Sequence, residues 1–176
     1  WCAPGFDDSA WQNAVPRRAP YGRLRAQNGP ADRVMEVLKP VKVEKLGGGR
    51  YRVDFGETVS GWVRLHGVRG EAGRRIEIKY LSESPNGSNA YTMKGEGPED
   101  YATRFTWYVF REVELSGWPG ELHPGQLTAE AVYSDVETTG GFACSNPLLN
   151  RIDRIWWRTQ LDNMHGAVSS DCPHRE

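Results

Sequence analysis

The last six residues of the chain hold its densest group of reactive side chains. Asp171, Cys172, His174, Arg175 and Glu176 supply two carboxylates, a thiol, an imidazole and a guanidinium. A carboxyl group in such a segment acts as a general acid when burial raises its pKa, or as a base or hydroxyl acceptor when it stays ionised. The guanidinium of Arg175 can bind a carboxylate or sugar hydroxyls through its fork of donors. A solvated polar loop with one salt bridge is the alternative interpretation.

The cysteines offer a weaker alternative chemistry. Cys172 with His165 or His174 could imitate a thiol–imidazole pair, but the sequence shows no third group to orient the base. The chain has three cysteines, and Cys2, Cys144 and Cys172 do not have the spacing of metal ligands. The sequence therefore predicts no metal site, no cofactor and no disulfide framework.

The region before this segment shows the pattern of short strands. Polar and apolar residues alternate from residue 41 onward, and Gly- and Pro-rich turns separate the runs. The predicted strands cover residues 41–46, 50–55, 62–68, 75–80, 101–115 and 127–136, the first two forming a hairpin around 47–49. Residues 16–30 are rich in Pro and Arg and are typical of a linker or an extended edge. Short strands at near-regular spacing predict an antiparallel β-sandwich.

Toward the C-terminus the hydrophobic period becomes helical. Ser145 or Asn146 can cap a helix, Pro147 suits its first turn, and the helix is expected to end near Asn163. Its apolar face consists of Leu148, Leu149, Ile152, Ile155 and Trp156. This stripe needs a partner. Either the helix opens a helical domain that lies mostly beyond Glu176, or it packs on the sheet.

Composition excludes several classes of function. The 176 residues have a net charge of −1 and a pI near 6.5, so a nucleic-acid partner is not expected. No run approaches the roughly 18–20 apolar residues that span a bilayer. A sequence that starts on Trp1 and stops on Glu176 is expected to belong to a longer protein. Its localisation, cytoplasmic or secreted, is therefore left open.

Short motifs in a shared order give the chain a resemblance to a known family. They occupy residues 6–11, 22–27, 54–56, 61–65, 104–106, 110–111, 141–150 and 171–176. In this order and spacing they resemble the bacterial α-L-rhamnosidases of glycoside hydrolase family 78. The resemblance implies three parts: the tail of an N-terminal sandwich module and linker (1–30), a concanavalin-like β-sandwich module (31–138), and the first segment of a catalytic (α/α)6 barrel (139–176).

The resemblance also implies roles for the terminal segment. Glu176 is similar to the family's general acid, and Asp171 and Arg175 resemble groups that hold the rhamnose hydroxyls. The family inverts configuration, which requires a second carboxylate about 6.5–9.5 Å from the acid. No residue of this chain matches that base, so the 176 residues alone are expected to be inactive. The implied partner is a rhamnose-containing glycan or glycoside.

A second function remains open beside this one. The aromatic run at residues 101–110 is compatible with a non-catalytic module that binds carbohydrate or serves as a scaffold. Alternation along a strand turns about half of those rings inward, which weakens that interpretation.

Overall fold

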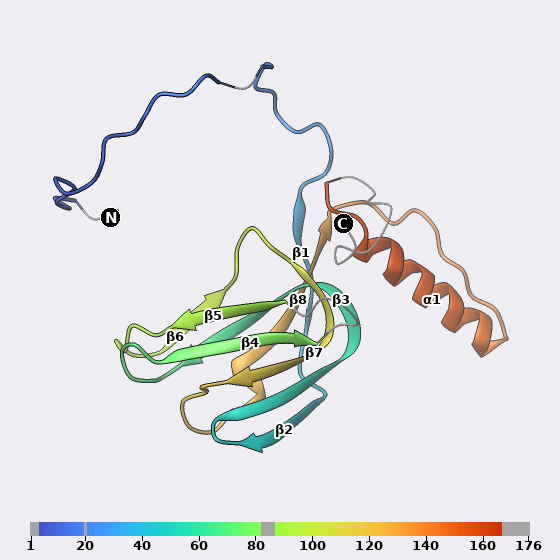
Figure 1. Cartoon of the computed structure of the whole chain (residues 1–176). Coiled ribbons are helices and arrows are strands. Elements are labelled where there is room, and N and C mark those ends of the chain that lie inside the picture. The colour runs from blue at the N-terminus through green and yellow to red at the C-terminus, as the bar shows by residue number, and fades with distance from the viewer. Residues whose placement is uncertain (1–3, 20, 82–86, 167–176) are drawn as a thin grey trace.

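The structure, a computed structural model, describes residues 4–19, 21–81 and 87–166 (Figure 1). Its regular elements form one antiparallel β-structure followed by a single helix. In chain order they are β1 (Asp32–Leu38), β2 (Lys42–Gly47), β3 (Arg50–Val68), β4 (Arg75–Leu81), β5 (Ser88–Thr92), β6 (Glu99–Ala102), β7 (Tyr108–Ser116), η1 (Pro124–Gln126), β8 (Leu127–Ser134) and α1 (Pro147–Asp162).

Strand β3 links the two halves of the sheet. Its residues 51–54 pair with β2 on one side and β7 on the other, while residues 61–65 pair with β8. From β7 the sheet continues to β4 and β5, and from β8 it continues to β1. Because β3 bends between these two sets of partners, the halves enclose a common core. The predicted antiparallel sandwich is confirmed.

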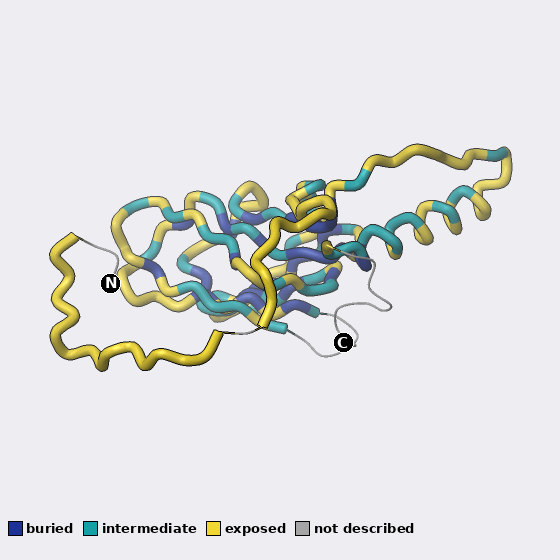
Figure 2. Tube along the Cα trace, turned by 90° about the horizontal axis from the view of Figure 1, so that it is seen from above, coloured by how far each residue is buried: buried dark blue, intermediate teal, exposed yellow. Residues whose placement is uncertain are grey.

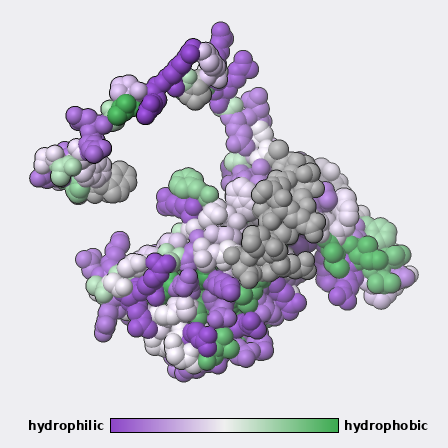
Figure 3. Space-filling view, in the orientation of Figure 1, coloured by the Kyte–Doolittle hydropathy of each residue, from purple (hydrophilic) through white to green (hydrophobic). Residues whose placement is uncertain are grey.

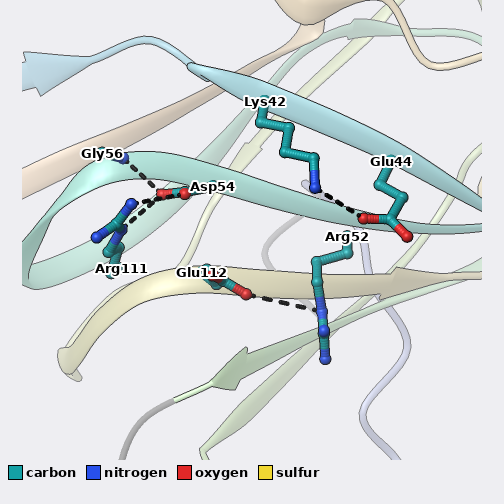
Figure 4. A network of polar contacts seen from close by, with 7 residues as sticks. All are labelled: Lys42, Glu44, Arg52, Asp54, Gly56, Arg111 and Glu112. Atoms are coloured by element: carbon teal, nitrogen blue, oxygen red, sulfur yellow. Dashed lines mark hydrogen bonds and ion pairs between the residues drawn. The ribbon is translucent and has the colours of Figure 1, made fainter.

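A charged side chain holds the bend of β3. The pairing register with β7 shifts between Asp54 and Val59, and Gly56 at this point has φ 85°. Gly56 N donates to Asp54 Oδ1 at 2.7 Å, and Arg111 donates to both Asp54 carboxylate oxygens at 2.8 Å (Figure 4). The bonds from Arg111 lower the pKa of Asp54. Asp54 is therefore engaged by the bulge of β3 and by Arg111.

The core follows from strict alternation along the strands. In β4, Ile76, Ile78 and Tyr80 are fully buried, while the residues between them are exposed. Trp118 and Phe110 add the largest buried side chains from the neighbouring segments. Figure 2 shows the buried residues concentrated in the sheet and the N-terminal arm exposed along its described length.

Several strand predictions need correction. The strand expected at 62–68 is the second half of β3, because the Gly56 bulge bends the strand without ending it. The run at 101–115 is divided into β6 and β7 by residues 103–107, where Phe105 adopts φ 61°. Strand β5, which begins at Ser88, is not among the predicted strands. Strand β1 is not predicted from the sequence.

Helix α1 forms as predicted, but its apolar stripe is exposed in the part of the chain that the structure describes. Asn146 caps the helix by accepting a hydrogen bond from Leu148 N at 2.9 Å. The stripe residues Leu148, Leu149, Ile152, Ile155 and Trp156 are 46–62% exposed. Figure 3 shows these hydrophobic side chains gathered over α1, which extends away from the sheet in Figure 1. Of the two alternatives for this stripe, packing on the sheet is not observed among the described residues. Within those residues, no helix has the length and apolarity to cross a bilayer.

The close approach of β3 and β8 predicts a strict requirement for glycine at residue 61. A Cβ at Gly61 would overlap the backbone carbonyl of Glu130. Gly61→Ala is therefore expected to lower the free energy of unfolding of the chain by about 2 kcal/mol or more, measured by urea denaturation. Gly125→Ala is the control, because a Cβ there meets no atom within 4 Å. Equal stability of the two variants would contradict the strand packing.

Candidate functional site

The residues with predicted catalytic or binding roles, Asp171, Arg175 and Glu176, lie outside the described residues, as does Cys172. The structure describes the chain up to Gly166, five residues before Asp171. The junction of α1 with the sheet immediately precedes this segment in the sequence.

An arginine on α1 joins the helix to two strands. Arg158 donates to both carboxylate oxygens of Glu36 on β1 at 2.9 and 2.8 Å, and to Glu57 on β3 at 3.0 Å. Tyr133 on β8 donates to the same Glu36 carboxylate at 2.8 Å. The hydrogen bonds from Arg158 lower the pKa of Glu36, and they raise that of Arg158 itself. Helix α1 thus presents charge, rather than its apolar stripe, to the sheet.

A buried carboxyl group follows one turn later. Asp162 is 5% exposed and accepts a hydrogen bond from Ser60 N at 2.9 Å. Burial raises the pKa of Asp162 to about 7, although the Ser60 amide and the charge of Arg158 oppose the rise. Near neutral pH this group therefore changes charge inside the junction.

An imidazole fills the space beyond Asp162. His165 Nε2 lies 2.8 Å from Ser60 Oγ, and the ring stacks on Trp107 with centroids 4.3 Å apart. His165 Nδ1 is 3.7 Å from Asp32 Oδ2, beyond hydrogen-bond length. Burial lowers the pKa of His165, against the opposing charge of Asp32. The imidazole is therefore neutral at neutral pH.

These groups resemble a nucleophilic triad in type only. Ser60 is fully buried, so its hydroxyl cannot meet a substrate. The separation between His165 and Asp32 also leaves the imidazole without the carboxylate contact that orients a catalytic base. The arrangement fits a structural polar junction. His165 is engaged with Ser60 and Trp107, while Cys172 and His174, the other members of the thiol–imidazole alternative, lie outside the described residues.

A groove of about 530 Å³ runs beside the junction. It lies between residues 56–58 of β3 and α1, and Arg151, Arg154 and Trp157 line its helical side. Among the described residues, no group of three or more His, Cys, Asp or Glu side chains converges as metal ligands would.

Sequence reasoning did not identify the junction. Asp162 and Ser60 are separated by 102 positions, and neither belongs to a recognisable motif. The one available signal was a pair of ionisable residues, Arg158 and Asp162, spaced by one helical turn.

Comparisons with known families place two matches along the chain. The model of the bacterial alpha-L-rhamnosidase concanavalin-like domain matches residues 83–133. The model of the bacterial alpha-L-rhamnosidase 6 hairpin glycosidase domain matches residues 137–176. The two matched regions follow one another as the β-structure and α1 do.

Individual relatives agree with the family matches. An alpha-L-rhamnosidase of Formosa agariphila is 30% identical over 194 residues, covering 100% of this chain and 20% of that protein. The alpha-L-rhamnosidase structure from "Dictyoglumus thermophilum" superposes with a TM-score of 0.84 at 34% identity, covering 97% of this chain and 21% of its own. The structure of the Streptomyces avermitilis alpha-L-rhamnosidase complexed with L-rhamnose superposes with a TM-score of 0.82 at 28% identity. The match covers 94% of this chain and 17% of that chain. The chain thus spans about a fifth of the length of these relatives.

The raised pKa of Asp162 predicts a pH dependence of stability. Between its ordinary value of 3.8 and about 7, the folded chain binds more protons than the unfolded chain, so stability falls as pH rises through this window. Asp162→Asn cannot ionise and keeps an acceptor for Ser60 N. The stability of this variant relative to wild type is therefore expected to increase by on the order of 2 kcal/mol between pH 4.5 and pH 8, measured by urea denaturation.

The control for the amide substitution is Asp153→Asn, at a position of the same helix that is not buried. A difference between Asp162→Asn and wild type that is the same at both pH values would show that Asp162 does not titrate in this window.

Proposed function

The chain belongs to the bacterial α-L-rhamnosidases of glycoside hydrolase family 78, and we propose that the protein containing it releases terminal α-L-rhamnose from rhamnosides. The observation that carries this proposal is similarity along the whole chain to a curated alpha-L-rhamnosidase, at 30% identity. The superposition on a solved alpha-L-rhamnosidase, with a TM-score of 0.84, supports it independently of sequence patterns.

In this proposal the terminal segment supplies one half of the reaction. Glu176 protonates the glycosidic oxygen as it leaves, and Asp171 and Arg175 hold the sugar hydroxyls. A carboxylate can accept from two hydroxyls, and a guanidinium can donate to two, so the pair can fix one sugar ring. Inversion needs a water on the opposite face and a second carboxylate to activate it. That base is expected in the part of the protein that these 176 residues do not include.

The same proposal assigns a role to each of three parts of the chain. In this proposal residues 31–138 are the sandwich module, residues 139–176 begin the catalytic helical domain, and residues 1–30 are the tail of an N-terminal sandwich module and a linker. The exposed apolar stripe of α1 supports a continuing helical domain, because an amphipathic helix ordinarily buries that face. The 176 residues alone are expected to be inactive, since they lack the base and a closed sugar pocket.

The alternative, a non-catalytic carbohydrate-binding or scaffolding module, draws less support from the structure. Of the rings that motivated it, Phe110 is buried, and Tyr101 and Tyr108 pack against the core. Phe105 is fully exposed and Trp107 is 36% exposed. Two rings, one of them stacked on His165, form a poor platform for a glycan.

The proposed role of Glu176 as general acid predicts a loss of rate when its carboxyl group is replaced. Glu176→Gln in the full-length protein is expected to lower kcat on phenyl α-L-rhamnoside by about 100-fold or more, since the amide cannot transfer a proton to this basic leaving group as a carboxylic acid does. The measurement is the steady-state release of the phenol. Glu121→Gln, an exposed glutamate of the sandwich, is the control. A wild-type protein that is inert on rhamnosides would refute the assigned sugar.

The inverting mechanism predicts the configuration of the product. The first sugar released from an α-L-rhamnoside is expected to be the β anomer, because a single displacement by water reverses the anomeric centre. Proton NMR of the anomeric signal in the first minutes of the reaction measures this. Initial release of the α anomer would contradict the assignment.

A further inference from the structure

The end of the sheet where β1 pairs with β8 holds the chain that leaves α1. Gly166 N donates to Asp32 Oδ1 at 2.9 Å and to Ser134 Oγ at 2.7 Å, and Ser134 N donates to Met164 O at 2.8 Å. We call these contacts, made by Asp32 and Ser134 to Met164 and Gly166, the sheet-end clamp. Two strands and the segment after the helix thus meet at one point.

The clamp is itself rigidly supported. Asp32 and Ser134 are directly opposite each other in the β1–β8 ladder, and Ser134 Oγ donates to Asp32 Oδ1 at 2.8 Å. Ser134 is 4% exposed, so water does not compete for its hydroxyl. Asp32 Oδ1 accepts from both the Ser134 hydroxyl and the Gly166 amide, and hydrogen bonds to a carboxylate are stronger than those to a neutral acceptor.

The side chain between the clamped residues is fixed as well. His165 is held against Trp107 and Ser60, so consecutive residues are restrained by both backbone and side-chain contacts. Gly166 adopts φ 72°, the left-handed region that glycine enters without strain. The sheet therefore sets both the position and the direction in which the chain leaves the junction.

This geometry has a consequence for the terminal segment. Asp171 follows Gly166 by five residues and Glu176 follows it by ten, which span at most about 17 Å and about 35 Å when fully extended. A displacement of about 1 Å in a reacting group can cost about 100-fold in rate. Resting on the function proposed above, we propose that Asp32 is a positioning residue for the catalytic segment at 171–176. In this proposal the clamp fixes the point on the sandwich from which the chain departs toward the general acid.

The alternative is that the clamp only stabilises the fold. The two roles differ in how they depend on the leaving group. A misplaced general acid slows the departure of a basic leaving group, which needs a proton, and has little effect on an acidic phenol that leaves as the anion. A loss of folded protein lowers the rate on both substrates by the same factor.

The experiment uses the full-length protein with two substrates, phenyl α-L-rhamnoside and 2,4-dinitrophenyl α-L-rhamnoside. Asp32→Ala removes the acceptor for Gly166 N and is expected to lower kcat on the phenyl substrate by about 10- to 100-fold. On the dinitrophenyl substrate the loss is expected to stay below about threefold. Asp32→Asn keeps an oxygen at the Oδ1 position and is expected to restore the phenyl rate to within about threefold of wild type.

The matched control is Asp100→Ala. Asp100 also accepts a hydrogen bond from a glycine amide, Gly67 N at 2.7 Å, but it lies on β6, away from the clamp. This variant is expected to retain the wild-type rate on both substrates. If Asp32→Ala fails to fold, Ser134→Ala removes one acceptor of the clamp and is expected to show the same dependence on the leaving group, to a smaller extent.

The outcomes separate this inference from the function on which it rests. Suppose that wild type turns over both substrates. If the folded clamp variants then lose the same factor in rate on both substrates, or keep the wild-type rate on both, the positioning role is wrong while the rhamnosidase function stands. If wild type turns over neither substrate, the proposed function fails and the positioning role fails with it.

Discussion

Ion pairs and hydrogen bonds attach α1 to the sheet, together with Leu161, which packs against the core. Arg158 donates hydrogen bonds to carboxylates on two different strands, and Asp162 accepts a hydrogen bond from the backbone amide of the buried Ser60. Asp162 is the buried member of this set, and a buried carboxyl group that loses its hydrogen-bond partner carries a free-energy cost. The junction therefore tolerates one arrangement of helix and strands, and the path of the chain beyond the helix depends on it.

The same arrangement explains the outward orientation of the helix. With its polar residues turned toward the sheet, α1 exposes the apolar stripe, and such an exposed face ordinarily marks an interface. The match of residues 137–176 to the hairpin glycosidase domain of the family supports the same division of the chain. In this account the sandwich is the base on which the helical domain is oriented, and the junction is the point of attachment.

The elements in which apolar residues repeat at a clear strand or helix spacing were predicted from the sequence. Strand β4, the hairpin of β2 and β3, and helix α1 follow from alternation, glycine turns and the Asn146 cap. Strand β1 lacked clear alternation, and the Gly56 region looked like a turn because a bulge and a turn use the same residues. The junction could not be predicted, because its contacts join residues about 100 positions apart. The roles of residues 171–176 came from resemblance alone, since a short polar segment is by itself weak evidence.

The most direct measurement of the central claim is a crystal structure of the full-length protein with L-rhamnose bound. We expect that Gly166 N remains bonded to Asp32 and Ser134, and that the Glu176 carboxyl group lies within hydrogen-bond reach of the anomeric oxygen. A structure in which the sugar is bound while Gly166 is detached from the end of the sheet, or in which Glu176 points away from that oxygen, would contradict it.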